Sequence, residues 1–517
     1  MLTNIIAAKC IGIDAVRVTV ELDIDRGIGI HLVGLADVAV KESLLRTTTA
    51  LESLGFRIPG KKIVINLAPA DLRKNGSGYD VPIAIGIIKA SEQKELPGAG
   101  KYIMMGELGL DGSIRGIPGA LPFTELAAKE GFEGIILPVE SALEAAEFNG
   151  TAVYGVSRLT EVIRILEEKE DVSDLLVWNR PEYNSILDGA QRSSGDEPVD
   201  FADIIGQESA KRALEIAAAG AHNLIFVGSP GSGKSSLAKA LPGILPPMTT
   251  EEATVTSKIY SIAGKGRSRF GLMRQRPFRA PHYSASIAAI VGGGNGDSII
   301  PGEVSLAQNG VLFADELGQM PRAVIEALRG PLEDRKVTIS RLKAKVEYPA
   351  SFMLVAASNP CPCGWFGEGD RCNCTPTQRM NYLSKLSGPL MDRIDLHVWM
   401  RSIEASRMLD RVPSEPSSEV AKRVLQARKI QEKRFEGENI LTNSEMGNRL
   451  IERYCPLSVE CMETMARLMD RLGLSMRAYF RIIKVARTIA DLEGSEDIKK
   501  AHLMEAAGYR FLDRKEY

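Results

Sequence analysis

The chain has 517 residues, too many for a single hydrophobic core, and this length predicts about three domains. Hydrophobic residues make up 44% of the sequence and charged residues 25%, the balance of a globular protein, and no apolar run approaches the ~20 residues that span a bilayer. The formal net charge of −2 gives no overall attraction for nucleic acid, and the first residues lack a signal-peptide pattern, so we expect a cytoplasmic protein with no membrane partner.

The first 170 residues are predicted to form an α+β domain. Short β-rich runs cover residues 16–24, 28–33 and 62–67, and helical patterns cover residues 38–54 and 79–91. The polar tract that follows, residues 184–200, is too poor in apolar side chains to offset the entropy of ordering it. We therefore assign residues 171–200 to an interdomain linker.

From residue 201 the sequence changes to strand–loop–helix units, which predict an α/β domain over residues 201–400. Three short apolar runs are typical of strands buried on both faces of a sheet, and they cover residues 224–227, 311–313 and 353–357. Beyond residue 401, apolar residues recur at three- and four-residue spacing. Residues 401–517 are therefore predicted to form a helical domain.

The first of these strands leads into Gly228-Ser-Pro-Gly-Ser-Gly-Lys-Ser235, which fits the phosphate-loop pattern G-x-x-x-x-G-K-[ST] and precedes a predicted helix. Glycines let the backbone N–H groups turn toward phosphate oxygens at the helix N-terminus. We expect Lys234 to reach the β- and γ-phosphates of ATP and Ser235 to bind Mg²⁺. The expected nucleotide-binding residues are Gly228, Ser229, Pro230, Gly231, Ser232, Gly233, Lys234, Ser235 and Ser236.

Polar side chains follow the other two strands. Asp315 and Glu316 come directly after the second strand, and Asn359 follows the third. Asp315 suits Mg²⁺ binding through water, and Glu316 suits the general base that polarises the attacking water. The amide of Asn359 can orient that water. Together with the phosphate loop, these residues predict hydrolysis of ATP–Mg.

Arg393 lies in the segment 387–395 and can be a cation directed at the γ-phosphate of a neighbouring subunit. Such an arginine stabilises the charge of the transition state. The alternative is an intrachain ion pair with Asp392 or Asp395.

Residues 253–296 contain no Asp or Glu but seven basic residues: Lys258, Lys265, Arg267, Arg269, Arg274, Arg276 and Arg279. Basic residues without compensation attract phosphates even on an acidic protein. A loop that contacts an acidic neighbouring subunit is the alternative.

Four of the seven cysteines lie within fourteen residues in the pattern C-x-C-x₈-C-x-C, at Cys361, Cys363, Cys372 and Cys374. Four thiolates in a short loop could close a tetrahedral Zn²⁺ site, and an odd cysteine count argues against a disulfide framework. The spacing within each pair is tighter than the usual C-x₂₋₄-C, so free buried thiols and redox-active pairs remain alternatives.

The phosphate loop, the basic segment 276–282 and the segments 301–307, 310–317, 359–364 and 387–397 come in one order that resembles the magnesium-chelatase-like AAA+ ATPases, specifically the bacterial YifB/ComM group. The resemblance covers essentially the whole chain. It implies an α/β P-loop AAA+ core, preceded by an α+β domain like that of Lon protease (ribosomal S5 domain 2-like) and followed by a C-terminal helical lid.

The same resemblance implies roles for individual residues. Asn359 matches sensor 1, Arg393 the arginine finger and Arg477 the sensor-2 arginine of the lid. The acid-free stretch matches a helix-2 insertion, and residues 335–349 match a β-hairpin before sensor 1 that points into the pore of the ring.

Members of the ComM type are similar to hexameric helicases that drive branch migration of DNA during homologous recombination in natural transformation. The resemblance therefore implies a ring, expected to be a hexamer, that acts on DNA. Basic pore loops would bind phosphates without reading bases, so sequence-independent and salt-sensitive binding is expected. The residues expected to contact DNA are Arg276, Arg279, Arg341, Lys343 and Lys345.

Three other functions stay open. A magnesium-chelatase motor uses the same core but generally lacks the N-terminal domain. A Lon-like protease would need a base beside Ser77, yet Pro122 occupies the position of the Lon lysine, and a serine without a base is a weak nucleophile. A remodeller of protein clients would use the same ATPase core.

Overall fold

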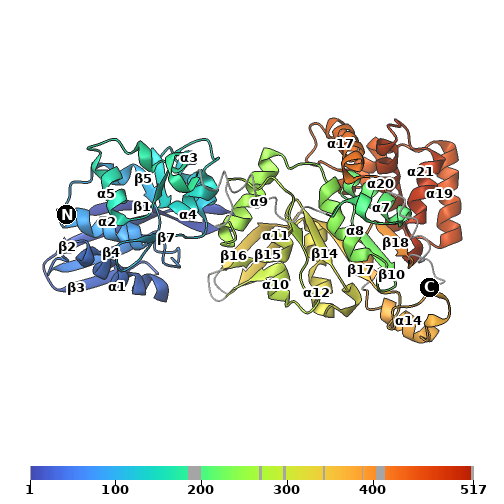
Figure 1. Cartoon of the computed structure of the whole chain (residues 1–517), viewed down its shortest axis with the longest axis horizontal. Coiled ribbons are helices and arrows are strands. Elements are labelled where there is room, and N and C mark those ends of the chain that lie inside the picture. The colour runs from blue at the N-terminus through green and yellow to red at the C-terminus, as the bar shows by residue number, and fades with distance from the viewer. Residues whose placement is uncertain are drawn as a thin grey trace.

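A computed structural model describes residues 2–35, 37–183, 199–266, 271–294, 299–341, 344–386, 388–402 and 414–513. Along its long axis the molecule has the N-terminal domain at one end, the domain of the phosphate loop in the middle and the C-terminal helices at the other end (Figure 1). Among the helices of these ranges, none is both long and apolar enough to cross a membrane.

The N-terminal domain is built on a mixed seven-stranded sheet in the order β3-β4-β2-β1-β5-β8-β9. Its strands are β1 (Thr3–Ile11), β2 (Asp14–Asp25), β3 (Gly29–Val33), β4 (Lys62–Ala68), β5 (Tyr102–Met104), β8 (Gly134–Pro138) and β9 (Ala152–Val156), with a small ribbon of β6 (Glu107–Leu108) and β7 (Ile114–Arg115). Its helices are α1 (Val38–Ser53), α2 (Asp80–Ala90), α3 (Ala120–Lys129), α4 (Val139–Ala142) and α5 (Leu159–Glu167). The three strands and two helices predicted here are confirmed to within two residues at each end.

The N-terminal domain extends past residue 170, where the sequence placed the start of the linker. Leu175 and Val177 are fully buried in the core of this domain, within short 3₁₀ turns. Apolar side chains at these two positions anchor the chain to the domain, so the boundary lies later than predicted. Residues 184–198 of the expected linker lie outside the described residues.

The central domain has a five-stranded sheet in the order β11-β14-β17-β10-β18, and every neighbouring pair in it is parallel. The strands are β10 (Leu224–Gly228), β11 (Phe278–Arg279), β14 (Val311–Ala314), β17 (Met353–Ser358) and β18 (Leu396–Met400). The helices are α7 (Glu208–Gly220), α8 (Lys234–Ala240), α9 (Thr250–Ile262), α10 (Ile287–Val291), α11 (Glu303–Leu306), α12 (Arg322–Ala327), α13 (Arg329–Asp334), α14 (Pro376–Leu383) and α15 (Gly388–Met391). The three apolar runs of the sequence are β10, β14 and β17, which are buried along their whole length, as strands covered on both faces must be.

Two antiparallel pairs extend the central domain. One joins β12 (Gly292–Gly293) to β13 (Ile300–Pro301), and the other joins β15 (Lys336–Arg341) to β16 (Ala344–Pro349). The second pair is the hairpin expected before sensor 1. It lies on the side of the domain that faces the N-terminal domain (Figure 1). The two are in contact, because a Cβ added to Gly12 of the N-terminal domain would lie 3.0 Å from the carbonyl oxygen of Glu347 in β16.

Helix α9 attaches the central domain to the N-terminal domain. Its Lys258, although almost fully buried, donates hydrogen bonds to Asp14 at 2.8 Å and to Glu125 at 2.6 Å. The backbone N–H of Gly119 also donates to the carbonyl of Ser261 at 3.1 Å. A buried charge is stable only when it is paired, so this contact fixes the two domains against each other.

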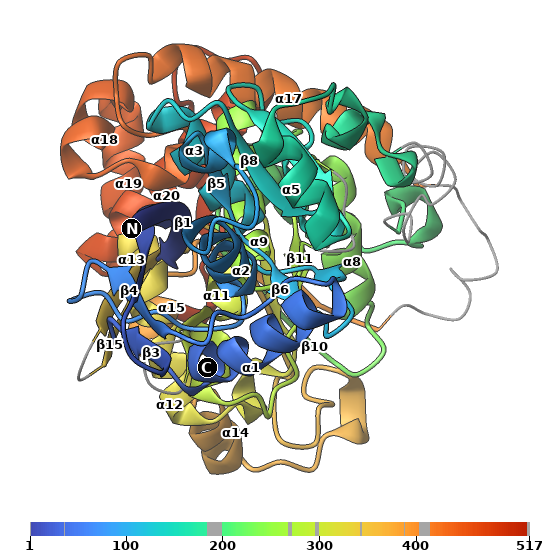
Figure 2. The same ribbon diagram turned by 90° about the vertical axis from the view of Figure 1, so that its left-hand side faces the viewer.

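The C-terminal helices are α17 (Ser417–Arg434), α18 (Asn448–Tyr454), α19 (Val459–Leu472), α20 (Met476–Leu492) and α21 (Lys500–Gly508). They gather on one side of the central domain, opposite α12 and α14 (Figure 2). Their apolar faces share one core with α7 and the central sheet, and this core includes Leu214 of α7 and Ile482 and Val485 of α20. The helical character predicted for this region follows from these buried stripes.

A buried polar group fixes the amino ends of β10 and β18 to α20. Asp395, only 5% exposed, accepts a hydrogen bond from the backbone of Asn223, pairs with Arg481 and lies 3.4 Å from Nδ1 of His222. Burial opposes ionisation of this carboxyl group. The charge of Arg481 and the contact with the His222 imidazole outweigh the effect of burial and hold the pKa of Asp395 well below its usual range.

We expect Asp395→Asn to lower the free energy of unfolding by about 3 kcal/mol, because it leaves Arg481 without its counter-ion. A lowered pKa stabilises the fold above the ordinary aspartate pKa of ~3.9, and that stabilisation is lost as the pH falls below it. Urea denaturation should therefore show the same difference between variant and wild type at pH 7 and pH 5, and a smaller one below about pH 4. Asp470→Asn, at an exposed position of α19, is the control and should change little. Equal stability of the Asp395 variant and the wild type at pH 7 would contradict the role of this group.

Candidate active site

All nine residues of the predicted phosphate loop lie between the end of β10 and the first turn of α8. Gly231 and Gly233 have φ angles of +76° and +92°, in the left-handed region that favours glycine. The amine of Lys234 donates to the carbonyls of Gly228 at 2.7 Å and Ser229 at 2.8 Å. These bonds hold the amine over the loop, where phosphate oxygens would take the place of the carbonyls.

Burial lowers the pKa of Lys234, and the nearby carboxylates of Asp315 and Glu316 partly oppose that shift. Both carboxylates stand at the carboxyl end of β14, where the sequence placed them. The hydroxyl of Ser235 donates to Oδ2 of Asp315 at 3.0 Å. The structure therefore brings the two predicted magnesium ligands into direct contact.

Glu316 has a φ angle of +51°, which is uncommon for a residue other than glycine. Its backbone N–H donates to Oδ1 of Asp315 at 2.9 Å, which fixes the turn after β14. Such backbone strain persists only where the surrounding structure enforces it. Here the turn keeps Glu316 next to Asp315 at the same edge of the sheet.

Asn359 reaches this edge through β17, which lies between β10 and β14. In the register, Ser358 is opposite Val227 of β10 and Ala356 is opposite Ala314 of β14. Asn359 lines a cavity of about 900 Å³ together with Gly318, after β14, and Tyr382 of α14. The structure thus gathers Lys234, Ser235, Asp315, Glu316 and Asn359 at one edge.

Arg393 lies at the amino ends of the strands of the same sheet, opposite the carboxyl ends where the phosphate loop lies. Its carbonyl accepts a hydrogen bond from the side chain of Asn223, the residue before β10, whereas the phosphate loop follows the last residue of β10. The five residues of that strand separate the two edges by roughly 16 Å. Arg393 therefore lies far from the phosphate loop of its own subunit.

The guanidinium group of Arg393 pairs with Glu333, so the intrachain ion pair occurs, but with a different acid from the predicted Asp392 or Asp395. Arg477 is largely exposed at the start of α20, and its guanidinium group pairs with Asp392 at 2.7 Å. The two arginines therefore lie close together, and each pairs with an acidic residue, Glu333 or Asp392.

The acid-free basic stretch is neutralised by acids from other parts of the chain. The prediction of an uncompensated phosphate-attracting field does not hold for its described residues, because sequence distance hid their partners. The ion pairs are Lys258 with Asp14 and Glu125, Lys265 with Glu303, Arg274 with Glu147, Arg276 with Glu252, and Arg279 with Glu303. Arg267 and Arg269 lie outside the described residues.

Arg276 and Arg279, both expected to contact DNA, are bound within the subunit. Arg276 donates to Glu252 and to the carbonyl of Asn309 at 2.7 Å, and Arg279 makes a two-pronged pair with Glu303. A carboxylate that pairs with a guanidinium group in this way balances its charge and so weakens its attraction for phosphate. This geometry favours a structural role for both residues over DNA contact.

Of the three hairpin residues expected to contact DNA, Lys345 is exposed, Arg341 ends β15 and Lys343 lies outside the described residues. Lys345 lines a cavity of about 1050 Å³ between the central and N-terminal domains. Ser77 lines the same cavity and donates its hydroxyl hydrogen bond to Glu107, while Pro122 is buried in the first turn of α3.

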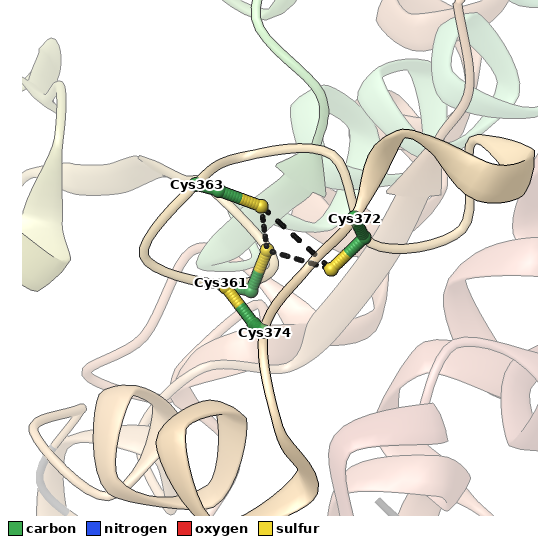
Figure 3. Close-up of side chains that lie close together, drawn as sticks. All are labelled: Cys361, Cys363, Cys372 and Cys374. Carbon is green, nitrogen blue, oxygen red and sulfur yellow. Dashed lines mark hydrogen bonds between the residues drawn. The ribbon is translucent and has the colours of Figure 1, made fainter.

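The four cysteines of the C-x-C-x₈-C-x-C pattern meet as predicted from their spacing. Their sulfur atoms all lie within 4.8 Å of one another, and all four are free thiols. Figure 3 shows the side chains converging from both ends of the loop 361–374. Once deprotonated, four such groups form the thiolate donor set that suits Zn²⁺.

Sequence reasoning missed two residues that hold the phosphate loop. The side-chain amide of Gln207, before α7, donates to the carbonyl of Ser232 at 3.0 Å. Glu368, in the cysteine loop, accepts the hydroxyl hydrogen bond of Ser229 at 2.9 Å. Neither position belongs to a motif, and each becomes recognisable only once tertiary contacts are known.

Comparison with family models covers most of the chain. Residues 20–141 match a model described as subunit ChlI of Mg-chelatase, residues 200–408 match magnesium chelatase subunit ChlI, and residues 414–510 match the C-terminal part of that subunit.

Individual relatives are similar over nearly the full length. The competence protein ComM of Haemophilus influenzae is 43% identical over 508 residues, covering 97% of this chain and 96% of that protein. The protein YifB of Escherichia coli K12 is 42% identical over 507 residues, covering 98% and 96%. The magnesium-chelatase 38 kDa subunit of Chlorobaculum parvum is 21% identical over 338 residues, covering 60% and 88%.

The position of Glu316 makes a direct prediction. Glu316→Gln should leave ATP affinity unchanged and lower turnover about 100-fold or more, because the amide cannot take a proton from water. ATP binding measured with a fluorescent nucleotide and steady-state phosphate release test the two halves separately. Glu432→Gln, an exposed position on α17, should behave as the wild type. Normal turnover of the Glu316 variant would remove Glu316 as the base.

Proposed function

Since the chain belongs to the magnesium-chelatase-like YifB/ComM family of AAA+ ATPases, we propose that it is an ATP-hydrolysing ring motor that moves on DNA as a branch-migration helicase. The observation that carries the ATPase part is the contact between Ser235 and Asp315, with Glu316 adjacent to it. This arrangement matches what hydrolysis of a nucleotide requires of a protein.

The residues at this edge fit ATP and Mg²⁺. The loop amides and the amine of Lys234 would bind the phosphates, and the hydroxyl and carboxylate oxygens of Ser235 and Asp315 are the donors that a hard cation prefers. When bound, Mg²⁺ supplies charge neutralisation at the phosphates. Glu316 would take a proton from the attacking water, and Asn359 would orient that water. The strands fix each of these groups before the nucleotide arrives.

The position of Arg393 and Arg477 supports assembly into a ring. Both lie on the amino side of the sheet, across from the phosphate loop of their own subunit. A neighbour that presents its phosphate loop to this surface would receive both arginines. We propose that each active site forms between two subunits, and that a hexamer is the closed form.

Action on DNA is supported by one relative and by the hairpin. The relative that is 43% identical is called a competence protein, a name that fits a role in DNA uptake and recombination. The hairpin carries the exposed Lys345 and stands out from the central sheet as a separate ribbon. We propose that hairpins from successive subunits bind DNA phosphates in the pore. We further propose that the N-terminal domain is of the Lon-like type and that the C-terminal helices form the lid of the ATPase.

A magnesium-chelatase motor is the second candidate, because the chain also resembles a 38 kDa chelatase subunit. That similarity is 21% identity and reaches only 60% of this chain. The competence protein matches 97% of it at twice the identity, so we place the DNA motor first.

DNA should stimulate ATP turnover if the proposal is correct. We expect single-stranded, duplex or forked DNA to raise phosphate release at low salt and to do so less at moderate salt, since phosphate binding releases counterions. Lys234→Ala should abolish turnover with or without DNA. Hydrolysis that no DNA stimulates would leave the ATPase standing and would favour a protein or tetrapyrrole-linked client.

The hairpin is tested by the same DNA substrates. The double variant Lys343→Ala, Lys345→Ala should weaken binding equally for all sequences and flatten the slope of log affinity against log salt by about 2. Lys429→Ala, Lys433→Ala removes the same charge from exposed positions on α17 and is the matched control. Equal salt slopes for the two double variants would exclude the hairpin as the contact.

If Arg393 of one subunit completes the active site of its neighbour, two inactive variants should complement each other in mixed rings. Arg393→Ala should lower turnover about 1000-fold, because each site then lacks one cation that stabilises the transition state, and Lys234→Ala should abolish it. Mixed rings of the two variants should recover activity where an intact loop meets an intact Arg393. Mixing Lys234→Ala with Glu316→Gln is the control, since every site then keeps a defect. Failure of the first mixture to recover would place Arg393 outside the reaction.

A further inference from the structure

The loop of residues 359–375 has almost no regular structure of its own. It contains Gly364, Gly367 and Gly369, all with positive φ angles, and one short 3₁₀ turn over Gly369–Arg371. Such a segment cannot bury enough apolar surface to hold one conformation, so it needs another constraint. The cysteine cluster lies at both of its ends.

The sulfur positions fit a metal rather than disulfides. The distance between the sulfur atoms of Cys361 and Cys363 is 3.3 Å, and Cys372 lies 3.7 Å from each of them. A tetrahedral Zn²⁺ with bonds of about 2.3 Å places its sulfurs about 3.8 Å apart, whereas a disulfide needs about 2.0 Å. Figure 3 shows these three contacts around a common centre, with Cys374 beside them.

The same loop rests on the phosphate loop. A Cβ on Gly364 would lie 3.0 Å from the ring of Pro230 and 3.8 Å from the side chain of Asn359. Glu368 accepts hydrogen bonds from the hydroxyl of Ser229 at 2.9 Å and from the backbone of Ser402 at 2.7 Å. The cysteine loop therefore packs between the phosphate loop and the end of β17, which Asn359 follows.

The middle of the loop is anchored separately. Phe366 meets Trp399 of β18 edge to face at 6.2 Å, and a Cβ on Gly367 would lie 2.9 Å from the same ring. Loss of the metal would free the two ends of the loop while this anchor and the central sheet remain. The expected consequence is local loosening and not unfolding of the domain.

We propose that Cys361, Cys363, Cys372 and Cys374 bind one Zn²⁺, and that the zinc-bound loop clamps the phosphate loop through Gly364 and Glu368. The metal holds the loop in one conformation. In this conformation Glu368 contacts Ser229, and Gly364, which has no Cβ, packs closely against Pro230. Metal binding and clamping do not rest on the proposed ATPase function.

The test measures metal and local order separately, on the full-length protein. Zinc content by mass spectrometry should be one per chain, and Co²⁺ substitution should give the absorption bands of a tetrahedral tetrathiolate site. Amide hydrogen exchange of a peptide over residues 228–236 reports order in the phosphate loop. Neither readout requires ATP hydrolysis, so an inactive enzyme would overturn the proposed function without affecting this result.

Three variants separate the metal from the clamp. Cys363→Ser removes an exposed ligand and should lose zinc and speed exchange of the phosphate-loop peptide about tenfold. Glu368→Ala should keep zinc and also speed exchange. Cys10→Ser, the same substitution outside the cluster, should change neither. Wild-type protein without bound metal would overturn the zinc site, and zinc-free Cys363→Ser with unchanged exchange would overturn the clamp.

Discussion

The parallel register of β10, β14 and β17 is the constraint on which the chemistry of this protein depends. Parallel strands end at the same edge of a sheet, so the phosphate loop, Asp315 and Asn359 must meet there once the strands pair. The strands are buried along their whole length, and a shift by one residue would turn their side chains to the other face. Packing of apolar residues therefore positions the polar ones.

The same sheet separates Arg393 and Arg477 from the phosphate loop of their own subunit. Arg393 and Arg477 lie on the far edge, paired with Glu333 and Asp392. In the proposed ring, a neighbouring phosphate would have to draw both arginines from these acids before the shared site is complete. Because charge-assisted bonds to phosphate are strong, a bound nucleotide can supply that energy at the interface between subunits.

The phosphate loop is held from outside as well as from within. Gln207 and Glu368 reach it from segments far away in the sequence. Elsewhere in the central domain, the buried Lys258 ties helix α9 to the N-terminal domain. Movements of α9 during an ATPase cycle would thus pass directly to the N-terminal domain. In the proposed motor, this contact would make the N-terminal domain move together with α9.

The sequence by itself determined the local elements and the chemistry at their ends. Apolar runs predicted β10, β14 and β17, and the motif residues at their ends, Lys234, Asp315 and Asn359, met as expected because strand ends are set by the strands themselves. Cysteine spacing likewise predicted a four-thiol cluster.

Only the tertiary structure decided which charges meet. The basic stretch looked free of acids, yet Arg276 and Arg279 pair with Glu252 and Glu303, and Arg393 pairs with Glu333. Long-range ion pairs leave no periodic pattern in a sequence, because side chains far apart in the chain are brought together by packing of apolar surfaces. For the same reason, the contact of the cysteine loop with the phosphate loop could be found only in three dimensions.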